Sequence, residues 1–150
     1  MTTPDPWSVL IIDDEPDIRE VTSMTLMDDG YRVETAADGI EGLDRLEAFG
    51  PQIVITDIRM PGMDGLQVLE AVKQRSADTE VIVATAFGEM ETAIRALQLD
   101  ASDFITKPIH TDAMMVALQR ARQRYTTRQQ IKDYTRHLEK GLDRTTRQLE

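Results

Sequence analysis

Residues 9–14 read Val-Leu-Ile-Ile-Asp-Asp, four apolar residues that end abruptly in two carboxylates. A strand that is apolar at every position is typical of a parallel sheet covered by helices on both faces. Further short apolar runs occur at 31–35, 53–55, 81–84 and 104–105, separated by segments in which apolar residues recur at helical spacing. This alternation predicts five parallel strands with helices between them.

The run at 31–35 differs from the others, because Tyr31, Val33 and Thr35 alternate with charged residues. Such alternation indicates a half-exposed strand at the edge of the sheet, whereas the uninterrupted runs indicate central strands. We therefore expect a doubly wound α/β sheet in the order 2-1-3-4-5. Asp38, and Asp64 with Gln67 three residues later, mark helix starts.

Composition excludes several classes of protein. The 150 residues contain no cysteine, so disulfides and thiolate metal sites are excluded. Neither a signal peptide nor a run of about 20 apolar residues is present, and we expect a cytoplasmic protein without a membrane span. Residues 1–110 carry 8 Lys and Arg against 22 Asp and Glu, and residues 111–150 carry 9 against 5. The acidic body argues against nucleic-acid binding by that part of the chain.

Polar residues follow four of the predicted strands. Asp13 and Asp14 follow the first, Asp57 the third, Thr85 the fourth and Lys107 the fifth. In open α/β sheets the functional crevice lies at the carboxyl ends of the strands. Three carboxylates brought together there need a shared cation, and oxygen-only ligands favour Mg²⁺, or Mn²⁺ in its place.

Four motifs, at residues 12–15 (IDDE), 57–65 (DIRMPGMDG), 84–86 (ATA) and 107–108 (KP), together resemble the receiver domains of bacterial two-component response regulators. The resemblance covers residues 7–124 and implies a flavodoxin-like (βα)5 fold like that of the chemotaxis regulators. It implies a regulatory phosphoacceptor, not an enzyme beyond its own phosphorylation and dephosphorylation.

The resemblance also implies roles for individual residues. Asp57 would accept a phosphoryl group from a histidine kinase or a phosphotransfer protein. By the same resemblance, a metal ion would be bound by Asp13, Asp14, Asp57 and the backbone carbonyl of Arg59. Phosphoryl binding and switching would fall to Thr85, Lys107 and Phe104. Loop geometry would depend on a cis Pro108, on Pro61 and on Gly65. The family commonly has glycine where Asp100 stands, and aspartate tolerates the left-handed conformation better than most residues.

From Thr111 onward the sequence predicts one helix of nearly forty residues. We expect a disordered N-terminal segment at 1–6, a receiver at 7–124 and a helical linker at 125–150. A weak coiled-coil seam, whose residues are Ile131, Thr135, Leu138, Leu142, Thr145 and Leu149, suggests a homodimer and an output domain outside this chain.

Two alternatives remain open. Basic residues recur every four positions along the helix, namely Arg120, Arg124, Arg128, Lys132, Arg136, Lys140 and Arg144, which would suit a DNA-binding regulator. Steps of four wind around a helix, however, so a solvated coiled-coil surface is the preferred interpretation. A Mg²⁺-dependent phosphatase of the haloacid dehalogenase type would need a second aspartate where Arg59 stands.

Overall fold

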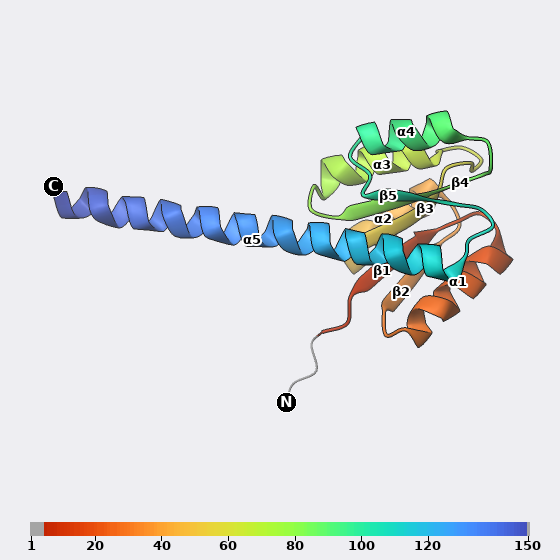
Figure 1. Ribbon diagram of the computed structural model, residues 1–150, viewed down its shortest axis with the longest axis horizontal. Coiled ribbons are helices and arrows are strands. Elements are labelled where there is room, and N and C mark those ends of the chain that lie inside the picture. Colours follow the sequence, from red (N-terminus) through yellow and green to blue (C-terminus); the bar gives the residue numbers. More distant parts are fainter. Residues whose placement is uncertain (1–4, 150) are drawn as a thin grey trace.

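The computed structural model describes residues 5–149, and the side chains of residues 5–141. Strands and helices alternate along the chain (Figure 1). The strands are β1 (Ser8–Ile12), β2 (Arg32–Ala36), β3 (Ile53–Asp57), β4 (Glu80–Thr85) and β5 (Asp103–Thr106). The helices are α1 (Pro16–Asp28), α2 (Gly39–Phe49), α3 (Gly65–Arg75), α4 (Met90–Gln98) and α5 (Thr111–Leu149).

The five strands form one parallel sheet in the order β2-β1-β3-β4-β5, which confirms the predicted fold. Every residue of β1, β3 and β4 is buried, whereas β2 is mostly half-exposed, as expected of an edge strand. Four of the strands extend slightly beyond their apolar runs, and β2 is shifted by one residue, from the expected 31–35 to Arg32–Ala36. Strand β4, for example, begins at Glu80, a charged residue that the apolar pattern does not include.

The helices cover the two faces of the sheet and create two hydrophobic cores. Helices α2, α3 and α4 pack on one face, where Leu43, Leu69 and Ala96 are buried. Helices α1 and α5 pack on the other, where Leu26 and Leu118 are buried. This arrangement leaves the carboxyl ends of all five strands along one edge of the domain.

The apolar spacing predicted the helices correctly but not all of their buried faces. In α4, Met90, Ile94 and Leu97 are 57%, 49% and 42% exposed, while Ala93 and Ala96 are buried. Alanine lets a helix approach the sheet closely, so the larger side chains flank the contact and point to solvent. Val21 and Ile40 are exposed for a similar reason, since each lies beside the buried stripe of its helix.

Helix α5 is one continuous helix of 39 residues, as the sequence predicts, and its distal part projects away from the domain (Figure 1). Its first turns bury Leu118 and Ala121 against the sheet. Tyr125 then packs edge-on against Trp7, with ring centroids 5.5 Å apart. The Arg122 guanidinium lies over the Trp7 ring, 5.0 Å from the ring centroid.

The basic residues of α5 correct one interpretation. Four basic side chains between Arg120 and Lys132 form ion pairs with acidic residues of the domain, so this part of the helix is not a free coiled-coil surface. The pairs are Arg120 with Asp103, Arg124 with Glu80 and Asp100, Arg128 with Glu80 and Asp100, and Lys132 with Asp78. Arg136 and Lys140 are exposed, whereas the side chains of Leu142, Arg144, Thr145 and Leu149 lie outside the described residues. Within the described part of the chain, none of the helices combines the length and apolar character needed to span a bilayer.

Candidate functional site

The predicted polar residues meet at one edge of the sheet. Asp57 and Thr85 are the last residues of β3 and β4, and Asp13 and Lys107 directly follow β1 and β5. Asp13, Asp57 and Thr85 are buried, with 4%, 7% and 2% of their surface exposed. The edge therefore gathers two buried carboxylates and a hydroxyl where a surface loop would normally leave such groups in water.

Lys107 bridges the two buried carboxylates. Its Nζ donates to Asp57 Oδ2 at 2.8 Å and to Asp13 Oδ2 at 3.1 Å. The peptide bond from Lys107 to Pro108 is cis, as the resemblance implies. Burial alone would lower the pKa of Lys107, but its hydrogen bonds and the charges of Asp57 and Asp13 raise that pKa above the usual value.

The surroundings of Asp57 disfavour its charged form, although Lys107 forms an ion pair with it. Burial, together with the nearby charge of Asp13, raises the pKa of Asp57, and the hydrogen bond and charge of Lys107 oppose that rise only in part. Carboxylate oxygens of Asp13, Asp14 and Asp57 lie within 4.8 Å of one another. One ammonium therefore does not neutralise the site, and the residues present fit a hard divalent cation.

Local hydrogen bonds hold the turn that carries the first two carboxylates. Asp13 Oδ1 accepts from the backbone N–H of Glu15 at 2.9 Å. The Arg19 guanidinium, one turn into α1, donates to the backbone carbonyl of Asp13 at 2.7 Å. Asp14 is thereby held beside Asp13 with its side chain more exposed.

Comparison with known proteins identifies the family. The model of the response regulator receiver domain family matches residues 9–119. The chain belongs to this family. It is 35% identical to the regulatory protein AtoC of Escherichia coli K12 over 89% of this chain and 28% of that protein. It is also 37% identical to the DNA-binding transcriptional regulator NtrC of the same strain, over 81% of this chain and 26% of that protein.

Comparison with solved structures supports the same family. A receiver domain protein from Clostridium thermocellum matches with a TM-score of 0.77 and 30% identity, over 81% of this chain and 98% of the other. The chain thus spans about a quarter of the length of the curated relatives AtoC and NtrC, and nearly all of this solved receiver domain.

In this receiver domain, the loop after Asp57 approaches the site very closely. The Gly65 N–H donates to the carbonyl of Ile58 at 2.8 Å, and a Cβ on Gly65 would lie 2.3 Å from the carbonyl oxygen of Asp57. Only glycine fits there. Pro61 lies exposed in the same loop. Asp64 and Gln67 form a capping box at the predicted start of α3.

A salt bridge joins the two loops on either side of the receiver site. Arg59 Nε lies 2.6 Å from Glu89 Oε1, and the Arg59 side chain is 74% exposed. The other carboxylate oxygen of Glu89 is buried and has no hydrogen-bond partner among the described residues. The loop that follows Thr85 is thereby tied to the loop that follows Asp57.

The two residues that the sequence predicts to act as the switch lie on neighbouring strands. Thr85 ends β4, and its carbonyl accepts from the N–H of Lys107 at 2.7 Å. Phe104, on β5, is half-buried and packs against the core beneath α4. Its backbone is paired with Val83 of β4, two residues before Thr85.

Sequence reasoning missed Arg19, Glu89 and Glu80. Arg19 and Glu89 contact the site only through the folded loops, and nothing in their spacing distinguishes them from surface residues. Glu80 gave one usable signal, because a charged residue begins a strand whose other residues are apolar or small. It lies at the opposite end of β4 from Thr85.

Proposed function

We propose that this receiver domain is a switch that accepts a phosphoryl group on Asp57 from a histidine kinase or a phosphotransfer protein. The observation that carries the proposal is the bridge from Lys107 to Asp57 and Asp13, a half-buried ammonium between two buried carboxylates. A carboxylate is a competent covalent acceptor, and phosphoryl transfer depends mainly on positioning and charge neutralisation.

A divalent cation would be held by Asp13, Asp14, Asp57 and the backbone carbonyl of Arg59. Bound Mg²⁺ or Mn²⁺ would supply the positive charge that offsets the incoming phosphoryl oxygens. An Asp57 carboxylate oxygen forms the new bond to phosphorus, while the bond from phosphorus to the donor breaks and its electron pair leaves with the donor. Lys107 then exchanges its contact with the Asp57 carboxylate for a phosphoryl oxygen, and the Thr85 hydroxyl donates to another.

The conformational readout is proposed to run through Thr85 and Phe104. Movement of Thr85 toward the phosphoryl group vacates space beside β5, which Phe104 fills by turning inward. Phe104 has no hydroxyl, so packing alone stabilises that position. A preference of a few kcal/mol is enough to invert a population of about one in a hundred.

Intact mass spectrometry tests the acceptor. The chain is incubated with Mg²⁺ and acetyl phosphate, and we expect a gain of one phosphoryl group that is lost in Asp57→Asn. The matched control is Asp44→Asn, which removes an exposed carboxylate from α2 and should still be phosphorylated. Absence of the gain in the wild type, or its survival in Asp57→Asn, would refute the proposal.

We further propose that residues 7–124 are the receiver and that 125–150 link it to an output module outside this chain, with homodimerisation through the helix. Exposed Ile131, Tyr134 and Leu138 on the projecting part of α5 support a partner there. DNA binding through the basic residues is disfavoured, because several of them are paired with the domain. Arg59 likewise disfavours a phosphatase, which would need aspartate at that position.

A further inference from the structure

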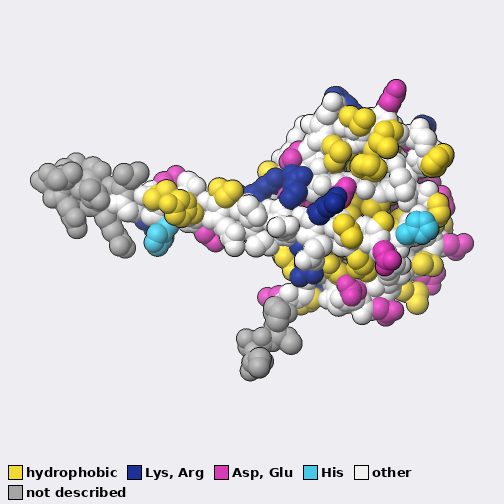
Figure 2. Space-filling view, in the orientation of Figure 1, with side chains coloured by type: hydrophobic (Ala, Val, Ile, Leu, Met, Phe, Trp, Pro, Cys, Tyr) yellow, Lys and Arg dark blue, Asp and Glu magenta, His cyan; other side chains and the backbone are white. Residues whose placement is uncertain are grey.

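A second group of charges lies at the end of the sheet opposite Asp57, where α5 leaves the domain. We call it the basal charge cluster. Its members are Lys73, Asp78, Glu80 and Asp100 from the domain and Arg124, Arg128 and Lys132 from α5. Basic side chains are visible at this junction in Figure 2.

Glu80 is the buried centre of the cluster. Its side chain is 0% exposed, and neither of its carboxylate oxygens has a hydrogen-bond partner among the described residues. Its ion pairs are with α5, at 3.3 Å to Arg124 Nε and 3.5 Å to Arg128 Nη1. Burial raises the pKa of Glu80 and lowers that of the adjacent Lys73. A buried carboxylate is strongly disfavoured without partners, so Glu80 depends on the nearby charge of Lys73 on α3 and on the two arginines that α5 supplies.

Asp100 supplies the second anion and explains a departure from the family pattern. Its φ is +76°, a left-handed conformation in which glycine is the usual residue. Its carboxylate accepts from Arg124 Nη2 at 2.7 Å and lies 3.6 Å from both Lys73 Nζ and Arg128 Nη2. The aspartate is therefore placed to gather three cations, which glycine could not do.

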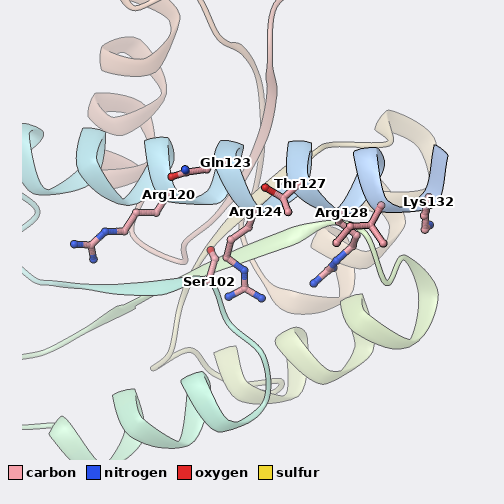
Figure 3. Close-up of a pocket in the computed structure, with 8 residues that line it drawn as sticks. Ser102, Arg120, Gln123, Arg124, Thr127, Arg128 and Lys132 are labelled. Atoms are coloured by element: carbon pink, nitrogen blue, oxygen red, sulfur yellow. The ribbon is translucent and has the colours of Figure 1, made fainter. Parts of the chain in front are cut away.

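The attachment of α5 changes character along the helix. Up to Ala121 it is apolar and buried, whereas from Arg124 to Lys132 it consists of long polar side chains that reach across an open groove of about 590 Å³ (Figure 3). Arg128 Nη1 donates to the carbonyl of Ala77 at 2.5 Å, and Gln129 and Lys132 both bind Asp78. Lifting this segment off the domain would expose little apolar surface beyond the contact of Tyr125 with Trp7, because Ile131 is already 59% exposed.

We propose that the basal charge cluster is a releasable ionic latch that seats residues 124–132 on the receiver, so that the projecting helix has a seated and a released position. The latch consists of ion pairs, so an increase in ionic strength weakens those of its pairs that are exposed to solvent. Glu80 begins the strand that Thr85 ends, roughly 17 Å away at 3.3 Å per residue. A displacement of β4 would therefore move the buried charge on which α5 rests. The latch itself does not depend on phosphorylation of Asp57.

Paired spin labels can measure the position of residues 124–132 relative to the domain, because the chain has no native cysteine to remove. Labels are placed at Glu70→Cys on α3 and Asp133→Cys on α5, both exposed, and the labelled chain is diluted into unlabelled chain. We expect a narrow distance distribution at low salt. It should broaden and shift in Arg124→Gln/Arg128→Gln, and should broaden at about 1 M salt, where the screening length falls to about 3 Å.

The matched control is Arg136→Gln/Lys140→Gln, which removes two exposed cations from the same helix beyond the cluster and should keep the narrow distribution. Hydrogen exchange gives a second reading: amides 126–132 should exchange about tenfold faster or more in Arg124→Gln/Arg128→Gln, because local opening frees them. An unchanged distribution and unchanged exchange in that variant would overturn the latch, as would equal broadening in the control.

A gentler variant covers the case in which neutralising both arginines prevents folding, as judged by circular dichroism. Asp100→Gly keeps Glu80 and all three cations of α5 and replaces a left-handed aspartate by the residue that suits this conformation. The latch predicts a partial broadening in Asp100→Gly together with a folded, cooperatively melting domain. A distribution identical to that of the wild type would count against it.

Discussion

The surroundings of Asp57 disfavour the charged form of its carboxyl group. It is buried, it lies near Asp13, and its pKa is raised although Lys107 donates to it at 2.8 Å. Replacing one member of a crowded carboxylate group by a neutral side chain of the same shape relieves both burial and repulsion. We expect Asp57→Asn to raise the free energy of unfolding by about 1 kcal/mol, because Lys107 keeps Asp13 as a partner.

Urea denaturation monitored by circular dichroism in the absence of divalent cations measures this effect. The comparison is Asp44→Asn, whose exposed carboxylate should leave the midpoint nearly unchanged. A lower midpoint for Asp57→Asn than for the wild type would show that the Lys107 pair outweighs the burial of Asp57.

The bridge between Arg59 and Glu89 should influence cation binding. Glu89→Gln removes one negative charge near the carboxylate group and releases the Arg59 guanidinium, two residues from Asp57. Both changes make the local potential more positive, so we expect Mg²⁺ to bind about two- to fivefold more weakly. Calorimetric titration with Mg²⁺ provides the measurement. Glu91→Gln, an exposed change in the same region, should weaken binding much less, and equal effects would mean that only net charge matters.

At the scale of elements, the connection from β3 to α3 depends on one glycine. A methyl group on Gly65 would lie 2.3 Å from the Asp57 carbonyl oxygen and 2.6 Å from Ile58 Cα, both of them rigid backbone atoms. We expect Gly65→Ala to lower the free energy of unfolding by about 2 kcal/mol or more and to slow phosphorylation.

The same substitution at Gly141 is a control of opposite sign. Gly141 lies within α5 and a Cβ there would meet nothing within 4 Å, so Gly141→Ala should favour the helix by about 1 kcal/mol at most. Thermal melting of both variants provides the comparison. Similar melting temperatures for the two would contradict the close approach at Gly65.

The strands and the site were predictable from sequence because both depend on short-range patterns. Uninterrupted apolar runs mark buried parallel strands, and the residue that follows such a run must lie at the functional edge. The buried faces of the helices were less predictable, because Ala93 and Ala96 form the contact of α4 while Ile94 flanks it. Glu80 was not predictable as a buried charge, since its partners lie more than forty residues away on α5.

For the whole molecule, the raised pKa values of two buried carboxyl groups should make the free energy of unfolding depend on pH. The folded-state pKa values of Asp57 and Glu80 are raised above their usual 3.8 and 4.5, so protonation during acidification adds stability as pH falls through those raised values. Asp78, hydrogen-bonded by Lys132, and Asp100, hydrogen-bonded by Arg124, have lowered pKa values. The stability that they contribute is lost only as pH falls below about 3.8 toward those lowered values.

We therefore expect the free energy of unfolding to rise as the pH falls through the raised pKa values of Asp57 and Glu80, and to fall again below about pH 3.8. The rise should be smaller in Asp57→Asn, because that variant lacks one of the two groups that take up a proton. Urea denaturation at a series of pH values measures it. A stability that falls steadily from pH 7 downward, with the same slope in both proteins, would contradict the raised pKa values.

The fluorescence of the single tryptophan reports on the place where α5 leaves the domain. Trp7 touches Tyr125 edge-on and carries the Arg122 guanidinium on its ring, so its surroundings are made largely by the helix that the latch would seat. Tryptophan emission from this chain thus originates at one place, where the domain and the projecting helix meet. Wavelength and quenching by iodide should change if the root of α5 moves and stay constant if only the distal turns lift. A native fluorophore can therefore locate the hinge in the unlabelled protein.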